Sequence, residues 1–188
     1  MTTDGILPLP VVLIGPMGSG KTKIGRRVAR SLGVPFVDTD SRIVRAHGPI
    51  SDIFERHGEA HFRRIERDVV AQAIGERAVV SLGGGAILDP ESQRDLAERT
   101  VVFLTVTADA VAQRINTDKR PLLKEGTHVW QSIFDERREI YERLATVTFD
   151  TSTGKISAIA DDIADWVRRA AGTGETGSTQ DDGDRREQ

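Results

Sequence analysis

Cysteine is absent from this 188-residue chain, and aromatic residues make up only 5% of it. The lack of cysteine excludes disulfide bonds and thiolate metal sites, and it is compatible with a reducing cytosol. No apolar run approaches the roughly 20 residues that a membrane-spanning helix needs, and the N-terminal residues lack the basic start and long apolar run of a signal peptide. We therefore expect a cytoplasmic protein without a membrane partner.

The chain also lacks a large excess of charge of either sign. Its formal net charge is -3, so its surface as a whole carries no electrostatic footprint for nucleic acid. The 4 histidines are scattered without the spacing of metal ligands or a nucleophile motif, and they receive no chemical role. The length suits one domain, because single domains commonly have about 100–200 residues, and we expect a monomer.

Short apolar, β-branched runs alternate with longer amphipathic segments along the chain. This alternation is typical of a parallel sheet with helices on both faces. The predicted strands are Val11–Ile14, Pro35–Asp38, Ala78–Leu82, Thr100–Thr105 and Thr146–Asp150. The predicted helices are Lys21–Leu32, Asp40–Ala46, Ser51–His57, Gly58–Ile74, Pro90–Glu98, Ala108–Ile115, Val129–Leu144 and Ile156–Ala171. The sequence therefore predicts a three-layer α/β/α fold around a five-stranded parallel sheet.

The two ends of the chain differ in composition from this body. Residues 1–8 form a short segment that ends in a proline, while residues 172–188 are rich in Gly, Thr, Asp, Glu and Arg and have no apolar face. Such segments cannot bury enough apolar surface to fold alone. We expect a flexible N-terminus and a disordered C-terminal tail around one domain of residues 9–171.

Residues 15–22 read Gly-Pro-Met-Gly-Ser-Gly-Lys-Thr and match the phosphate-binding motif G-x-x-x-x-G-K-[ST] at every position. They lie between a predicted strand and a predicted helix, which disfavours the alternative of a glycine-rich turn without a ligand. Glycines let backbone N–H groups approach the phosphates, and the positive end of the following helix favours anions. The residues expected to hold the nucleotide phosphates are Gly18, Ser19, Gly20, Lys21 and Thr22.

Four further segments follow in order: Asp38-Thr39-Asp40, Phe62–Glu66, Ser81–Gly85 and Arg120–Leu123. In this order they resemble the shikimate kinase family, and the resemblance extends from about Val11 to Ala170. It implies a kinase of the phosphate-loop NTPase fold, with a mobile lid at about residues 115–126. It also implies transfer of the γ-phosphoryl group of ATP to the 3-hydroxyl of shikimate, with Mg²⁺ as cofactor, in the biosynthesis of chorismate and aromatic amino acids.

Two carboxylates end the second predicted strand, at the sheet edge where open α/β folds bind their ligands. In an extended segment Asp38 and Asp40 project to the same side. The resemblance implies that Asp38 holds Mg²⁺ through water, together with the hydroxyl of Thr22, and that Asp40 binds the acceptor and removes the proton of the attacking hydroxyl. The alternative for Asp40 is that it caps the following helix.

Arginines suit a carboxylate-bearing acceptor because each guanidinium presents two parallel donors. The resemblance implies that Arg63 and Arg137 bind the carboxylate of shikimate, and that Glu66 orients Arg63. The chain departs from the family pattern just after Arg137, so Arg138 or Arg143 is an alternative there. A solvated helix face would also account for Arg137.

Three consecutive glycines, Gly83, Gly84 and Gly85, follow the third predicted strand. Without a lysine they are not a second polyphosphate loop, and they allow a close approach of the backbone to a ligand. The resemblance implies that they contact shikimate, and that Ser81 stands where other phosphate-loop enzymes have an acid. A plain flexible turn is the alternative.

The remaining predictions concern the nucleotide. The resemblance implies that Arg120, in the lid, meets the transferring phosphoryl group and that Arg114 stacks on adenine. Thr151–Lys155 resembles the loop beside the adenine, although an ordinary turn would explain it nearly as well. Lys23 stands where relatives have a small hydroxyl residue, and it either points to solvent or touches the α phosphate.

Two other functions remain open from the sequence. A kinase for gluconate or a nucleoside monophosphate would share the phosphate loop and the lid. A nucleotide-binding module without catalysis is the second alternative. The candidate catalytic residues Asp40, Lys21 and Arg120 argue against it, because a pure binder has no use for a base beside the γ phosphate.

Overall fold

The computed structural model describes residues 6–114 and 127–172. The predicted lid at 115–126 lies outside the described residues, as do residues 1–5 and 173–188 of the predicted flexible ends. Within the described ranges no helix is long and apolar enough to cross a membrane.

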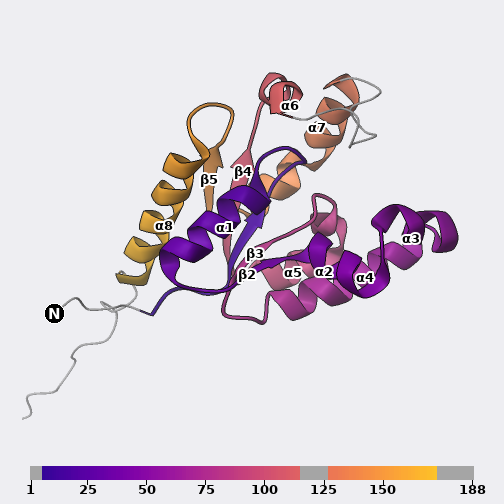
Figure 1. The fold of residues 1–188 in the computed structure, drawn as a ribbon, viewed down its shortest axis with the longest axis horizontal. Helices are drawn as coiled ribbons and strands as arrows, with labels where there is room; N and C mark the ends of the chain where they lie inside the picture. Colours follow the sequence, from indigo (N-terminus) through magenta and orange to yellow (C-terminus); the bar gives the residue numbers. More distant parts are fainter. Residues whose placement is uncertain (1–5, 115–126, 173–188) are drawn as a thin grey trace, which may run out of the picture.

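A five-stranded sheet forms the centre of the molecule, in the order β2-β3-β1-β4-β5 (Figure 1). The strands are β1 (Val11–Ile14), β2 (Phe36–Asp38), β3 (Val79–Ser81), β4 (Thr100–Thr105) and β5 (Val147–Asp150). All four neighbouring pairs are parallel, and Val12 pairs with Val80 on one side and Val101 on the other. The predicted parallel sheet is confirmed, and its carboxyl ends lie at one edge.

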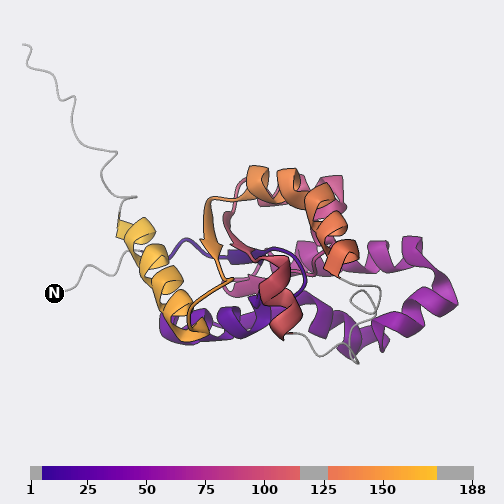
Figure 2. The ribbon, with the colours of Figure 1, turned by 90° about the horizontal axis from the view of Figure 1, so that it is seen from above.

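Helices cover both faces of the sheet, which gives the predicted three layers (Figure 2). They are α1 (Lys21–Leu32), α2 (Thr39–His47), α3 (Ile50–His57), α4 (Glu59–Ala73), α5 (Pro90–Leu96), α6 (Ala108–Arg114), α7 (Thr127–Leu144) and α8 (Ile156–Gly172). A short 3₁₀ helix, η1 (Ala86–Leu88), was not predicted. The bounds of β1, β4 and α1 are as predicted, and the other described boundaries lie within two residues of the predicted ones.

Alternate residues of the central strand β1 pack into the hydrophobic cores on opposite faces of the sheet. Val11 and Leu13 pack with α1 and α8, whereas Val12 and Ile14 pack with α4, α5, α6 and α7. All four are at most 1% exposed. Burial of each such side chain stabilises the fold by about 1.5–3 kcal/mol, which is why a strand covered on both faces is apolar throughout.

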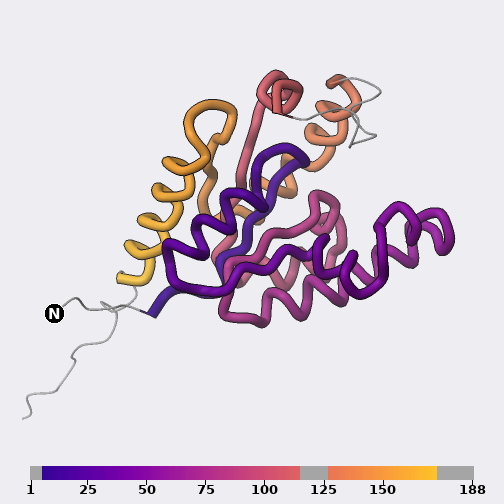
Figure 3. The backbone as a smooth tube through the Cα atoms, viewed as in Figure 1, coloured from indigo at the N-terminus to yellow at the C-terminus, as the bar shows by residue number. Residues whose placement is uncertain are grey.

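The segment from α2 to the first half of α4 forms an arm that extends away from the sheet (Figure 3). Its own small core joins Ile43, Ile53 and Phe62. Gly48 and Gly58 end α2 and α3 with φ values of 86° and 78°, a conformation that favours glycine, so the chain reverses sharply at both places. The arm holds the start of α2 and one face of α4 against the carboxyl edge of the sheet.

Candidate active site

A cleft of about 1050 Å³ opens at the carboxyl ends of β1, β2 and β3. Its walls come from the phosphate loop, the start of α2, the inner face of α4, the glycine segment Gly83–Gly85 and α7. The predicted site residues that line it are Gly18, Ser19, Gly20, Lys21, Thr22, Asp38, Asp40, Arg63, Gly83, Gly84, Gly85, Arg114 and Arg137. Arg120 is the remaining predicted residue, and it lies outside the described residues.

The phosphate loop is built for an anion. Gly18 and Gly20 have φ values of 87° and 88°, and no acidic residue lies in the first turn of α1. The Nζ of Lys21 donates to the carbonyl oxygens of Gly15 (2.7 Å) and Pro16 (3.0 Å). The lysine side chain therefore folds back over its own loop. From there its ammonium can exchange these carbonyl oxygens for a phosphate oxygen.

A hydroxyl and a carboxylate meet beside this loop. The Oγ1 of Thr22 donates to Oδ2 of Asp38 (2.7 Å), and Oδ1 of Asp38 accepts from the backbone N–H of Ser41 (2.9 Å). Asp38, rather than Asp40, is therefore the cap of α2. Mg²⁺ prefers oxygen ligands and usually keeps several waters and substrate phosphates, so the pair Thr22 and Asp38 fits this ion.

Asp40 lies in the first turn of α2. The prediction that Asp38 and Asp40 project together from an extended segment is therefore wrong, because the strand ends at Asp38. Both carboxylates nevertheless line the cleft. A Cβ at Gly83 would lie 2.5 Å from Oδ1 of Asp40 and 3.1 Å from Oε1 of Glu66. Glycine at this position therefore leaves room for two acid side chains, a role beyond the approach to a ligand.

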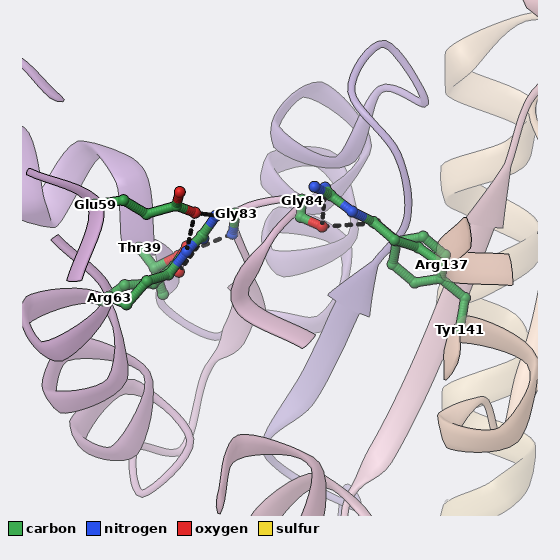
Figure 4. Close-up of polar contacts among 8 residues, drawn as sticks. Thr39, Glu59, Arg63, Gly83, Gly84, Arg137 and Tyr141 are labelled. Carbon is green, nitrogen blue, oxygen red and sulfur yellow. Dashed lines mark hydrogen bonds and ion pairs between the residues drawn. The ribbon is translucent and has the colours of Figure 1, made fainter. Parts of the chain in front are cut away.

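Thr39, between the two acids, is a residue that the sequence analysis missed. Its side chain is buried, its Oγ1 donates to the carbonyl of Ser81 (3.3 Å), and it accepts from the N–H of Gly83 (3.1 Å). These bonds join the start of α2 to the glycine segment (Figure 4). The available signal was its place within Asp38-Thr39-Asp40, where a small hydroxyl residue can bond a neighbouring strand end.

Arg63 is held by two carboxylates of its own helix. Its Nη1 donates to Oε2 of Glu66 (2.6 Å), and its Nη2 donates to Oε1 of Glu59 (3.0 Å). A Cβ at Gly85 would lie 2.5 Å from Nη1, so the guanidinium rests against this glycine. Burial lowers the pKa of Arg63, but hydrogen bonds and charge from Glu66 and Glu59 outweigh burial, and the net shift is upward. The side chain is therefore a fixed, permanent cation.

The second cation meets the other side of the glycine segment (Figure 4). The carbonyl oxygen of Gly84 accepts from Nη1 of Arg137 (3.1 Å) and from the hydroxyl of Tyr141 (2.7 Å). Burial raises the pKa of Tyr141 to about 12, opposed by Arg137, so this hydroxyl remains a donor. Arg137 therefore faces the cleft from α7.

The two alternative arginines are engaged elsewhere. Arg138 pairs with Asp135 (2.6 Å) on the exposed side of α7. Arg143 donates to Oε1 of Gln93 on α5 (2.7 Å). Neither lines the cleft. The geometry favours Arg137 over both.

The far end of the cleft brings two predicted nucleotide elements together. The guanidinium of Arg114, at the end of α6, donates to the carbonyl oxygens of Thr151 and Ser152 in the loop after β5. The hydroxyl of Thr151 in turn donates to the carbonyl of Ser19 (3.0 Å). This loop therefore contacts both Arg114 and the phosphate loop, whereas Lys23 is exposed at the rim.

Comparison with known proteins gives the family. The family model for shikimate kinase matches residues 17–168. This chain belongs to the shikimate kinase family. It is 46% identical over 145 residues to a shikimate kinase of Thermobifida fusca (strain YX), covering 75% of this chain and 84% of that relative. It is 43% identical over 153 residues to one of Mycobacterium avium (strain 104), covering 79% and 87%.

Solved shikimate kinase structures have the same fold. Shikimate kinase from Acinetobacter baumannii in complex with shikimate superposes with a TM-score of 0.79 at 34% identity, covering 85% of this chain and 93% of that chain. Shikimate kinase from Aquifex aeolicus superposes with a TM-score of 0.73 at 30% identity, covering 87% of this chain and 97% of that chain. A gluconokinase from Sinorhizobium meliloti gives 0.61 at 18% identity, which shows the fold alone.

Within this member of the shikimate kinase family, Glu66 is the most buried acid of the cleft, at 4% exposure. Burial raises its pKa, Arg63 opposes the shift, the charge of Asp40 adds to it, and Arg137 opposes it. Two acids and two arginines therefore share one electrostatic environment. Removal of any one charge changes the balance felt by the others.

We expect Glu66→Gln to remove a pH-dependent part of the stability. Because the folded-state pKa of Glu66 is above the ordinary 4.5, the folded protein holds this proton to a higher pH than the unfolded chain does. Its contribution to the free energy of unfolding is then fully present below about pH 4.5, and it is lost as the pH rises through the raised pKa. The Tm of the wild type minus that of the variant should fall over this window.

Thermal unfolding from about pH 4 to pH 7 measures this difference. Glu59→Gln is the control, because it removes the other carboxylate that pairs with Arg63. The side chain of Glu59 is 65% exposed. A wild-type-minus-variant difference for Glu66→Gln that stays constant over the window contradicts the expectation.

Proposed function

We propose that this protein transfers the γ-phosphoryl group of ATP to the 3-hydroxyl of shikimate, giving shikimate 3-phosphate and ADP in the pathway to chorismate and aromatic amino acids. The observation that carries the proposal is the cleft at the carboxyl ends of β1, β2 and β3. It joins a complete phosphate loop to Asp40 and to two arginines that flank the glycine segment. This arrangement suits an acceptor that bears both hydroxyls and a carboxylate, and the family membership supports the choice of shikimate.

In the proposed reaction Asp40 accepts the proton of the attacking hydroxyl. The acceptor oxygen forms a bond to the γ phosphorus as the bond from that phosphorus to the β–γ bridging oxygen breaks, and ADP leaves. Such chemistry depends mostly on positioning and on neutralisation of charge. Lys21 serves this by moving from the carbonyls of Gly15 and Pro16 to the γ phosphate. Arg120, from the proposed lid of residues 115–126, adds the second cation.

The acceptor carboxylate is the proposed ligand of Arg63 and Arg137. Each presents a guanidinium, and both contact the glycine segment, so donors converge from opposite sides of it. Phe54 and Phe62 line the same end of the cleft with ring centroids 4.7 Å apart, which supplies an apolar wall for a carbocycle. The proposed domain for this function is residues 9–171.

The nucleotide half of the proposal uses the remaining cleft residues. The loop from Gly18 to Thr22 holds the phosphates, and Arg114 stacks on the adenine. Thr22 and Asp38 would hold Mg²⁺, which when bound neutralises charge on the phosphate oxygens. The donor and acceptor sites are both built from one chain, which supports a monomer. The cytoplasm is the proposed location.

An acceptor panel tests the proposal. With ATP and Mg²⁺ and a coupled assay for ADP, shikimate should give turnover, whereas gluconate and nucleoside monophosphates should give none above background hydrolysis. Phosphorus NMR of the product should place the phosphate on the 3-hydroxyl. ADP release with gluconate or a nucleoside monophosphate, and none with shikimate, would refute the proposed acceptor.

A further inference from the structure

Helix α7 contacts both loops that form the floor of the cleft. Near its C-terminal end Tyr141 donates to the carbonyl of Gly84 (2.7 Å). Near its N-terminal end the indole Nε1 of Trp130 donates to the carbonyl of Met17 in the phosphate loop (2.9 Å). The tryptophan is 3% exposed, and its bond joins residues 113 positions apart in the sequence. Neither the phosphate-loop motif nor the proposed chemistry uses this contact.

The direction of the Met17 carbonyl fixes the direction of the next N–H. In a trans peptide the C=O and N–H point to opposite sides, so a carbonyl held toward α7 turns the N–H of Gly18 away from α7. Gly18 lines the cleft with a φ of 87°. Within residues 6–114 and 127–172 no protein acceptor is recorded for this N–H. It is therefore a donor that remains available for a ligand.

The indole itself is held firmly. Trp130 stacks on Phe134 with ring centroids 5.4 Å apart, Phe134 lies 6.4 Å from Tyr141, and Tyr141 stacks on Phe103 of β4 at 5.1 Å. This row of rings is part of the core between the sheet and α7. Because the rings pack against the sheet, the indole N–H cannot turn away without disturbing the core.

We propose that Trp130 is a positioning residue for the nucleotide: by holding the Met17 carbonyl toward α7, it keeps the Gly18 N–H directed at the phosphates. The inference deepens the proposed function and rests on it only in taking the phosphate loop as the nucleotide site. It does not depend on which acceptor is phosphorylated. A purely structural Trp130 would contribute to stability without affecting nucleotide affinity.

Trp130→Phe is the direct test, because phenylalanine keeps an aromatic ring beside Phe134 and removes only the indole N–H and part of its area. We expect the Kd for ADP and the KM for ATP to rise about 5- to 20-fold, in keeping with loss of one hydrogen bond that orders the loop. The KM for shikimate should stay within two-fold, and kcat within three-fold. Calorimetry with ADP and steady-state kinetics provide these values.

Trp166→Phe in α8 is the matched control. The chain has 2 tryptophans, and Trp166 packs on the opposite face of the sheet, away from the cleft. This variant should bind ADP like the wild type. It also leaves Trp130 as the sole tryptophan. The tryptophan fluorescence of Trp166→Phe should therefore change on addition of ADP, whereas that of Trp130→Phe should not.

Three outcomes decide the inference. An ADP Kd within two-fold of the wild type in Trp130→Phe, with only a lower Tm, overturns it. If Trp130→Phe does not fold, the Trp166→Phe protein decides, because unchanged emission at saturating ADP overturns the inference and a changed emission supports it. The expected rise in the ADP Kd of Trp130→Phe, together with no phosphorylation of shikimate by the wild type, would refute the proposed function and leave this inference standing.

Discussion

Asp40→Asn is expected to lower kcat about 10²–10³-fold while leaving the Kd for ATP unchanged. Asparagine keeps the size of the side chain and one oxygen acceptor, but it cannot take a proton from the acceptor hydroxyl. Asp40 lies in the first turn of α2, and the phosphate loop is a separate wall of the cleft, so nucleotide binding should survive the change. Steady-state kinetics with shikimate and calorimetry with ATP measure the two effects.

The same substitution should not destabilise the protein. The charge of Asp40 contributes to the raised pKa of Glu66, which means that the two carboxylates repel each other in the folded state. Removal of one charge relieves this repulsion, so the Tm of Asp40→Asn should equal or exceed that of the wild type. Such opposition of activity and stability is typical of catalytic acids and bases.

Asp165→Asn is the control for this variant. Asp165 pairs with Arg168 on α8, and its side chain is 59% exposed. The kcat of Asp165→Asn should stay within two-fold of that of the wild type. Near-normal turnover in Asp40→Asn would contradict the assignment of the base, and a large rise in the ATP Kd would show that the carboxylate acts on the nucleotide instead.

The layered fold was predictable because its signals are local and periodic. A strand covered on both faces must be apolar throughout, as Val11–Ile14 is, and a helix that covers a sheet must be amphipathic. The phosphate loop was equally readable, since polyphosphate demands glycines and a lysine at fixed spacing. Element ends were less certain, because capping depends on one side chain. Asp38 rather than Asp40 caps α2, a choice set by where the strand stops.

The contacts that hold the cleft together were not predictable in the same way. Tyr141 and Trp130 reach backbone carbonyls that are 57 and 113 positions away, and no local pattern marks such a partner. Thr39 received no role from the sequence, although it joins α2 to the glycine segment. The packing around two of the three glycines also lies in three dimensions, since the side chains of Asp40 and Arg63 occupy the space that a Cβ would take.

Gly85→Ala is the second substitution with a large expected effect, and it follows from this packing. The new Cβ would lie 2.5 Å from Nη1 of Arg63, at the tip of a flexible side chain. The guanidinium can swing aside, so the fold should be retained with a Tm within a few degrees of the wild type. Its bond to Glu66 and its proposed contact with the acceptor carboxylate would be lost. A hydrogen bond to a charged group is worth about 1.5–3 kcal/mol, so the KM for shikimate should rise about 10- to 100-fold.

Gly75→Ala is the matched control because it adds the same methyl group outside the cleft. A Cβ there would lie 3.4 Å from its nearest neighbour, the carbonyl oxygen of Gln72, which is an ordinary contact. Its kinetics should match the wild type. Kinetics with shikimate and ATP separate the possible results for Gly85→Ala. A higher KM for shikimate with an unchanged KM for ATP supports the argument. An unchanged KM for shikimate would mean that Arg63 does not bind the acceptor, since the methyl group and the guanidinium cannot share this space.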